Sequence, residues 1–199
     1  ELIVRKEKSQ NIIEHNMNRL GIEKYNYKAA YYLSKEEKEW AKQEISEFKN
    51  PLLAICTKSK ESVKNWPVEY WTELLKSLIT KFSIIQLGDK AEPKFQGVRS
   101  FAGKLSMRES AALLSQAKLF IGPDSLLMHV ANGLNIKSLI IFGGSRPVEC
   151  FGYANNINLT STPECSPCWI HDGYETCPND YHCLRSISVV NILSKISLN

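Results

Sequence analysis

From residue 51 onward, short apolar runs alternate with amphipathic segments along the chain. Uninterrupted apolar runs are typical of strands buried on both faces, and the runs here are 52–56, 83–87, 119–121 and 139–142, with a further short strand at 98–101. Between them, apolar residues at helical spacing predict helices over 67–79, over 106–116 and from residue 124. Strands alternating with helices indicate parallel strands joined by right-handed crossovers. We therefore expect an α/β domain with a Rossmann-like parallel sheet over 51–199.

The first 50 residues have a different pattern, with helical spacing and no strand-like run. Apolar positions predict one helix over 9–20, with Gly21 as its stop signal. A second helix over 34–48 begins with Ser34 followed three residues later by Glu37, which is the pattern of a capping box. We expect these helices to precede the α/β domain as a separate segment.

Composition places the protein in the ordinary globular class, with 43% hydrophobic and 23% charged residues. The net charge is +4 and the lysines are scattered, so a phosphorylated ligand or an anionic lipid suits the surface without being required. There is no basic stripe interleaved with aromatic residues, and we therefore expect no nucleic-acid partner. The longest apolar runs fall far short of the ~20 residues that span a bilayer.

The first residues have neither the apolar centre nor the cleavage site of a signal peptide. We therefore expect a cytoplasmic protein, either free or peripheral at a membrane. The chain does not begin with Met, which we interpret as a sign of a fragment.

Ligands of open parallel sheets bind outside the carboxyl ends of the strands. After the predicted strand at 119–121, Gly122-Pro123-Asp124-Ser125 leads into a helix, whose free N–H groups and positive dipole end form an anion site. An ordinary N-cap role for Asp124 or Ser125 is the alternative. His129 lies one turn further on, where it either reaches the same anion or packs beneath the loop.

After the first strand, the segment from Thr57 to Pro67 is polar and basic and leads into a helix. Its hydroxyls and lysines suit a diphosphate. The alternative is a solvated loop, and we favour that reading for Lys58 and Lys60 because loop lysines are mostly exposed.

Several short motifs follow one another in a distinctive order, although each is weak alone. They are Lys64 two residues before Trp66-Pro67, Gly88 after the second strand, Ala102-Gly103-Lys104 with Ser106, Pro123-Asp124-Ser125 with Met128-His129, Phe142-Gly143, and Cys165-Ser166-Pro167-Cys168. This succession, over roughly residues 50 to 195, resembles glycosyltransferase family nine. That family includes the ADP-heptose:lipopolysaccharide heptosyltransferases.

The resemblance implies a GT-B fold, in which two Rossmann-like domains face a cleft. This chain resembles the second, C-terminal domain, which binds the nucleotide sugar. Residues 1–50 are then connector helices from the end of a missing first domain, and that domain supplies the acidic catalytic base. The implied reaction is inverting transfer of heptose from ADP-heptose to a lipopolysaccharide-core or related acceptor, peripheral at the inner membrane and without a catalytic cofactor.

The resemblance also implies roles for individual residues. Thr57 and Lys64 bind the donor diphosphate, and Lys64 neutralises the charge that grows on the leaving nucleotide. Asp124 binds hydroxyls of the transferred sugar, so Lys64 and Asp124 are the implied catalytic residues of this chain. The backbone amides of Ser125, Leu126 and Leu127, together with the His129 side chain, hold phosphate oxygens.

For the nucleoside, Leu105 matches the position that packs on the base, while Asp89 and Glu92 compete to contact the ribose. Relatives commonly have Gly where Leu126 stands, and a side chain there crowds the backbone approach that Gly permits. Two alternatives therefore remain open: a GT-B transferase that uses another nucleotide sugar, and a metal-stapled interaction module without activity.

Four of the six cysteines lie close together in the sequence, at Cys165, Cys168, Cys177 and Cys183. In a cytosolic chain such clustering favours tetrahedral zinc or iron over disulfides. Unpaired thiols and disulfides remain alternatives. His171 and His182 are substitutes for a cysteine ligand, whereas the isolated Cys56 and Cys150 are expected to be buried as small hydrophobic residues.

Overall fold

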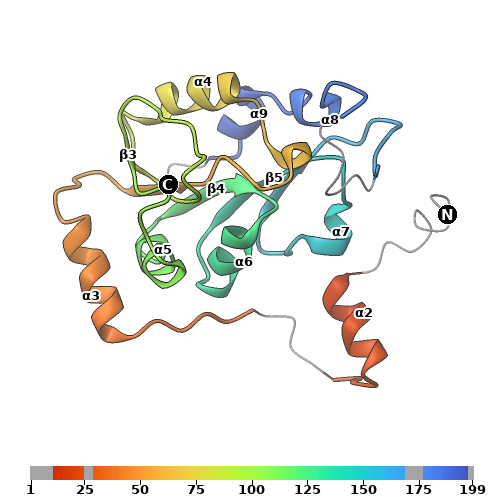
Figure 1. The fold of residues 1–199 in the computed structure, drawn as a ribbon, viewed down its shortest axis with the longest axis horizontal. Helices are drawn as coiled ribbons and strands as arrows, with labels where there is room; N and C mark the ends of the chain where they lie inside the picture. Colours follow the sequence, from red (N-terminus) through yellow and green to blue (C-terminus); the bar gives the residue numbers. More distant parts are fainter. Residues whose placement is uncertain (1–10, 25–28, 169–176, 197–199) are drawn as a thin grey trace.

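The computed structural model describes residues 11–24, 29–168 and 177–196. Its strands are β1 (Leu52–Ile55), β2 (Ser83–Gln86), β3 (Val98–Ser100), β4 (Leu119–Pro123), β5 (Ser138–Phe142) and β6 (Ile157–Thr160). They form one parallel sheet with the order β3-β2-β1-β4-β5-β6 (Figure 1). The predicted Rossmann-like α/β architecture is confirmed. The edge strand β6 was not predicted, because polar residues alternate with apolar ones in it and give no continuous apolar run.

Helices cover both faces of the sheet (Figure 1). One face carries α3 (Lys35–Glu44), α5 (Met107–Leu114) and α6 (Leu126–Gly133). The other face carries α4 (Val68–Leu78), α8 (His182–Arg185) and α9 (Val189–Leu193). The remaining elements are α2 (Ile12–Arg19), the 3-10 helix η1 (Ser62–Lys64) and α7 (Val148–Phe151).

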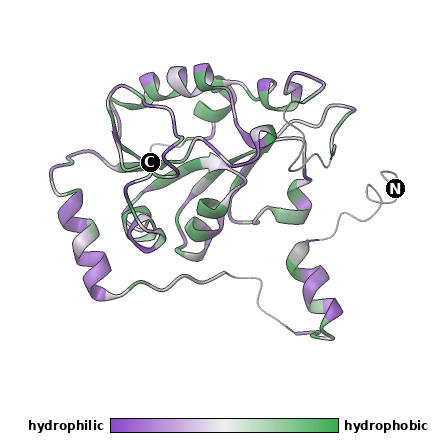
Figure 2. Ribbon diagram, in the orientation of Figure 1, coloured by the Kyte–Doolittle hydropathy of each residue, from purple (hydrophilic) through white to green (hydrophobic). Residues whose placement is uncertain are grey.

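Alternation along each central strand divides its side chains between two cores. In β1, Leu52 and Ala54 pack toward α5 and α6, whereas Leu53 and Ile55 pack toward α4. Both sets are buried, so an apolar residue is favoured at every position of the strand. Figure 2 shows the result as a sheet that is largely hydrophobic, beside a mostly hydrophilic α3.

The chain reverses its direction of winding between β1 and β4, which are neighbours in the sheet although they are far apart in the sequence. Ile55 and Ile121 are paired in register, so the loops that follow β1 and β4 leave the same edge side by side. That edge is the topological switch point, where α/β sheets leave a crevice for ligands.

The capping box predicted at the start of α3 is present: Glu37 N donates to Ser34 Oγ, and the Glu37 carboxylate accepts from Ser34 N. The helix ends at Glu44 rather than at the predicted residue 48. Arg108 of α5 pairs with Glu37, and Arg99 of β3 pairs with Glu44. These contacts hold α3 against the α/β unit.

In the N-terminal part, α2 ends at Arg19 and Gly21 adopts a φ of +67°, which fits its predicted role as a stop. Among the described residues, no helix is both long enough and apolar enough to cross a bilayer.

Candidate functional site

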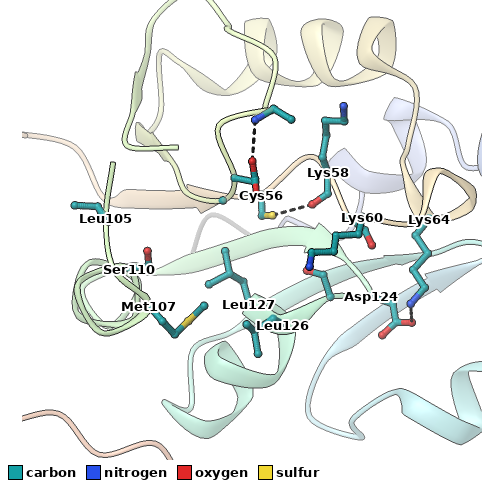
Figure 3. A pocket seen from close by; sticks show the side chains of 15 residues that line it. Cys56, Lys58, Lys60, Lys64, Leu105, Met107, Ser110, Asp124, Leu126 and Leu127 are labelled. Carbon is teal, nitrogen blue, oxygen red and sulfur yellow. Dashed lines mark hydrogen bonds and ion pairs between the residues drawn. The ribbon is translucent and has the colours of Figure 1, made fainter. Parts of the chain in front are cut away.

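A cavity of about 660 Å³ opens at the carboxyl edge of the sheet, beside the ends of β1 and β4 (Figure 3). The loops after β1, β2 and β4 and the N-terminal turn of α5 supply its walls. This volume is in the range of small-molecule sites. The pocket therefore lies where the sheet topology predicts a ligand.

Lys64 reaches this pocket from η1 and is only 6% exposed. Its Nζ lies 3.2 Å from Asp124 Oδ2 and 3.4 Å from Glu61 Oε1 (Figure 3 shows the first pair). A buried ammonium requires such partners, because desolvation without them is costly. The structure thus brings together Lys64 and Asp124, the two residues that the resemblance implies as catalytic.

Two members of this charge network were missed by the sequence reasoning. Glu61 lies three residues before Lys64, and its carboxylate also pairs with Arg146 Nη2 at 3.3 Å. Arg146 follows β5 and lies over the ring of Phe151, 5.1 Å from its centroid. The spacing of Glu61 to Lys64 was a readable signal for that pair, whereas the Arg146 contact spans 85 positions and had none.

The N-terminus of α6 is open toward the pocket. Ser125 is its N-cap residue, yet its side chain forms no cap hydrogen bond, and the first turn carries no acidic residue. Ser125 Oγ is buried and has no hydrogen-bond partner among the described residues. The self-capping alternative is therefore not what the structure shows. The first amides of α6 and its positive dipole end remain available for an anion.

An apolar wall borders the pocket near the N-termini of α5 and α6. It consists of Leu105, Met107, Leu126 and Leu127 (Figure 3). Leu126 is 59% exposed and Met107 is 40% exposed, although both are large hydrophobic side chains. Lys58, Lys60 and Lys64 also line the pocket. The pocket thus offers lysines to a charged group and an apolar surface to a planar or aliphatic one.

Glu92 is buried beneath the loop that follows β1. Its carboxylate accepts hydrogen bonds from the backbone N–H groups of Thr57 and Lys58, both at 2.9 Å, and from the Thr57 hydroxyl. Gln86 Nε2 donates a further bond at 3.0 Å. The single proton of the Thr57 hydroxyl is thus directed to Glu92, and Thr57 is 2% exposed.

Asp89 has the opposite environment from Glu92. It is exposed and lines the pocket, while neither Glu92 nor Thr57 is part of the described lining. Of the two acidic residues that compete for the ribose, Asp89 is the one that lines the pocket in this structure. The roles of Thr57, Asp89 and Glu92 toward a donor stay predictions.

Cys56 lies on the pocket wall but is not an activated thiol. Burial, and then the neighbouring Glu92 carboxylate, raise the pKa of the Cys56 thiol. A thiol with a raised pKa stays protonated and is a poor nucleophile. Cys56 and Cys150 are both buried, as expected for small hydrophobic side chains.

His129 belongs to a contact that the sequence did not reveal. Its Nδ1 lies 2.8 Å from the Tyr153 hydroxyl, and the two rings pack edge to face at 5.6 Å. Burial lowers the pKa of His129, against the effect of Asp124, which raises it. The imidazole is therefore neutral at neutral pH. Its ring lies outside the described lining of the pocket, so its predicted phosphate contact stays a prediction.

The cysteine segment approaches the loop that follows β5. Cys183 Sγ accepts a hydrogen bond from Gly144 N at 3.1 Å. Burial raises the pKa of the Cys183 thiol, the Gly144 amide lowers it, and Cys177 and Cys165 raise it. None of the six cysteines, all of which lie within the described residues, forms a disulfide. Within the described residues, no three His, Cys, Asp or Glu side chains gather closely enough to hold a metal ion, and His171 lies outside those residues.

Residues 3–176 match glycosyltransferase family 9 (heptosyltransferase). Lipopolysaccharide heptosyltransferase 1 of Pseudomonas aeruginosa is 30% identical over 129 residues, which make up 59% of this chain and 36% of that protein. The chain spans about a third of the length of the curated relatives that it matches.

Solved structures of similar fold belong to the same class of enzyme. A family 9 glycosyltransferase from Veillonella parvula covers 94% of this chain with a TM-score of 0.72 and 18% identity, over 59% of its own chain. The dodecameric iron-containing heptosyltransferase TibC of enterotoxigenic Escherichia coli, in complex with ADP-D-β-D-heptose, covers 73% with a TM-score of 0.64 and 24% identity, over 44% of its own chain. At these identities the likeness establishes the fold.

Proposed function

The chain belongs to glycosyltransferase family 9, the heptosyltransferase family, and we propose that its α/β unit binds the nucleotide-sugar donor, ADP-heptose, for transfer of heptose. The observation that carries this proposal is the pairing of Lys64 with the open N-terminus of α6 at one pocket. A lysine and a free helix N-terminus together favour a ligand that carries a diphosphate.

The geometry supports distinct tasks for the two halves of the Lys64–Asp124 pair. In this proposal, the Lys64 ammonium and the first amides of α6 hold the diphosphate and stabilise the negative charge that grows as it leaves. Asp124 holds hydroxyls of the sugar. Because Lys64 Nζ and Asp124 Oδ2 are 3.2 Å apart, the sugar–phosphate bond that breaks lies where these two groups meet.

The apolar wall near Leu105 and Met107 suits the flat face of a nucleobase, and Asp89 is available to the ribose. The acceptor of the proposed inverting transfer is lipopolysaccharide core or a related saccharide, and the base that activates it belongs to the acceptor-binding domain of the two-domain family fold. The proposal requires no divalent metal for catalysis, because Lys64 and α6 supply the positive charge.

Isothermal titration calorimetry with ADP, ADP-heptose and UDP tests the donor assignment. We expect saturable binding of ADP and ADP-heptose at one site and weaker binding of UDP. Lys58→Ala and Lys60→Ala are compared with Lys64→Ala, since Lys58 and Lys60 also line the pocket but are exposed. We expect both to weaken ADP binding less than Lys64→Ala does. Folded protein that binds none of these nucleotides would contradict the donor role and favour the interaction module.

Stronger binding of a different nucleotide would instead favour a transferase with another donor. The exposed Leu126, at the position where relatives commonly have Gly, is the feature that this outcome would implicate.

We further propose that Cys165, Cys168, Cys177 and Cys183 hold a structural zinc or iron ion. Four thiols within one segment suit a tetrahedral site, and the Gly144 N–H that bonds to Cys183 Sγ is the kind of partner that stabilises a thiolate ligand. TibC, which shares the fold, is an iron-containing protein. In the described part of the chain these thiols are not gathered closely enough to hold a metal ion, so the proposal requires the segment to close around the ion when it binds.

Elemental analysis of anaerobically purified protein decides this second proposal. We expect about one metal ion per chain, lost in Cys165→Ser and Cys183→Ser and kept in the control Cys150→Ser. Metal-free wild-type protein that retains its fold would contradict it.

A cytoplasmic location, peripheral at the inner membrane, is the final part of the proposal, and it rests on the lipopolysaccharide-core acceptor implied by the family. Fractionation of cells that make the tagged full-length protein tests it. Recovery in the periplasm would contradict it.

A further inference from the structure

The loop that follows β5 is wedged between the turn that carries Lys64 and the cysteine segment. A Cβ atom added at Gly143 would lie 2.5 Å from the carbonyl oxygen of Val63, the residue before Lys64. A Cβ atom at Gly144 would lie 3.1 Å from Cys183 Cβ and 3.2 Å from its Sγ. A side chain at Gly143 would therefore force the backbone of η1 to shift, and one at Gly144 would push against Cys183.

Hydrogen bonds fasten the loop to the cysteine segment. Gly144 N donates to Cys183 Sγ at 3.1 Å, while Gly144 O accepts from Cys168 N at 3.0 Å and from Ser166 Oγ at 3.2 Å. Both backbone polar groups of Gly144 are thus bonded to residues around the cysteines. The Cys183 sulfur is thus in direct contact with this loop.

A charge contact fastens the same loop to Lys64. Glu61 Oε1 lies 3.3 Å from Arg146 Nη2 and 3.4 Å from Lys64 Nζ. The Glu61 side chain is only 17% exposed, and that of Lys64 is 8% exposed. One carboxylate oxygen thus bridges a cation of the loop and the pocket lysine, in a place where water screens the charges poorly.

We propose that the loop Gly143–Arg146 positions Lys64 and couples the state of the Cys183 thiol to donor binding. This inference rests on the proposed function, because it takes Lys64 as the ligand of the donor diphosphate. Arg146 holds Glu61, Glu61 holds the Lys64 ammonium beside Asp124, and Gly143 supports the backbone of η1. A covalent modification of Cys183 displaces Gly144 and, through the loop, changes the affinity of the pocket for a nucleoside diphosphate.

The first test measures ADP dissociation constants for variants on the two sides of the loop. We expect Arg146→Ala and Cys183→Ala each to weaken ADP binding by about 5- to 20-fold, the range of ordinary coupling between sites. The double variant should lose little more than the larger single effect, because both changes release the same loop. Arg146→Lys keeps the charge and should restore most of the affinity.

Arg185→Ala is the matched control, since Arg185 also forms two ion pairs, with Glu69 and Asp180, and neither pair includes Lys64 or a residue of the loop. Thermal unfolding of each variant separates lost affinity from lost fold. Fully additive losses in folded variants would overturn the coupling, and so would an unchanged ADP affinity in Arg146→Ala.

The second test uses the reciprocity of coupled sites: if the Cys183 state changes ADP affinity, ADP must change the reactivity of Cys183. The rate of Cys183 alkylation by iodoacetamide, followed by peptide mass spectrometry, should fall about fivefold or more at saturating ADP. Arg146→Ala, saturated with ADP, should lose this protection. Metal content is determined in the same samples.

Two failures are distinguishable. Wild-type protein that binds ADP but shows no change in Cys183 alkylation overturns the inference and leaves the donor role intact. Wild-type protein that binds no ADP overturns both.

Discussion

Helices α5 and α6 make an instructive pair, because both are eight residues long, both follow a serine N-cap and both begin at the same pocket. Their first turns differ completely. In α5, Glu109 N donates to Ser106 Oγ, and the Glu109 carboxylate accepts from Ser106 N. In α6, the Ser125 side chain makes no cap bond.

The side chain at the third position of each helix differs as well. In α5 it is Glu109, which closes the capping box and places a negative charge at the N-terminus. In α6 it is Met128, which is fully buried in the core and can do neither. The first turn of α6 therefore carries no acid that would compete with an anionic ligand, whereas the first turn of α5 does.

Removal of the cation opposite the open helix should have the largest effect. Lys64→Ala is expected to weaken ADP binding about 10- to 150-fold, because a charge-assisted hydrogen bond contributes about 1.5–3 kcal/mol. Calorimetry measures the loss, and Lys42→Ala, at an exposed lysine of α3 outside the pocket, should change affinity by less than about threefold. Equal affinity of wild type and Lys64→Ala would remove Lys64 from the donor site.

An acid added to α6 should make it resemble α5. Leu126→Glu places a carboxylate in the first turn, where it stabilises the helix by about 0.3–1 kcal/mol through the dipole. The same charge repels a diphosphate. We expect ADP binding to weaken about tenfold, which corresponds to about 1.4 kcal/mol of binding free energy. Leu126→Gln is the neutral control. Affinity that falls equally in both variants would point to shape rather than charge.

Replacing each N-cap serine with alanine should change the free energy of unfolding by different amounts. Ser106→Ala is expected to lower the free energy of unfolding by about 1 kcal/mol, the usual value of a cap. Ser125→Ala should lower it by less than about 0.5 kcal/mol, since no cap bond is lost. Urea denaturation followed by circular dichroism compares them. A larger loss for Ser125→Ala would show that its hydroxyl does cap α6.

The smallest expected effect is a pH dependence of stability that comes from Glu109 in α5 and has no counterpart in the first turn of α6. Hydrogen bonds with the backbone and then the side chain of Ser106 hold the pKa of Glu109 below its ordinary value of 4.5. A carboxylate with a lowered pKa stabilises the folded protein above its unfolded pKa, and this contribution is lost as the pH falls through the folded pKa. The difference in melting temperature between wild type and Glu109→Gln should therefore shrink between about pH 5 and pH 3. A difference that is constant with pH would contradict this assignment.

Local pattern was sufficient for most of the elements. The apolar runs of β1 and β4 and the serine–glutamate pair at the start of α3 were readable because each depends on neighbours within a few residues. Strand β6 and the helices α7, α8 and α9 were not, since the strand is a half-exposed edge and the helices are only four or five residues long. Their positions depend on packing against elements that are distant in the sequence.

In the pocket, the sequence identified some of the residues, and only the structure revealed others. Lys64 and Asp124 were identified through their motifs, and the structure places them 3.2 Å apart. Arg146 and Tyr153 carried no signal, because their partners Glu61 and His129 lie 85 and 24 positions away.

The sequence by itself determined the alternation of buried strands and helices, and through its ordered motifs it indicated the family, because both are written in residue types at short spacing. Only the tertiary structure decided what each polar side chain touches. It turned the Thr57 hydroxyl toward Glu92, left α6 uncapped and joined Cys183 to the loop that holds Lys64. These contacts cross between loops that meet only when the parallel sheet brings its strand ends to one edge, so no local pattern encodes them.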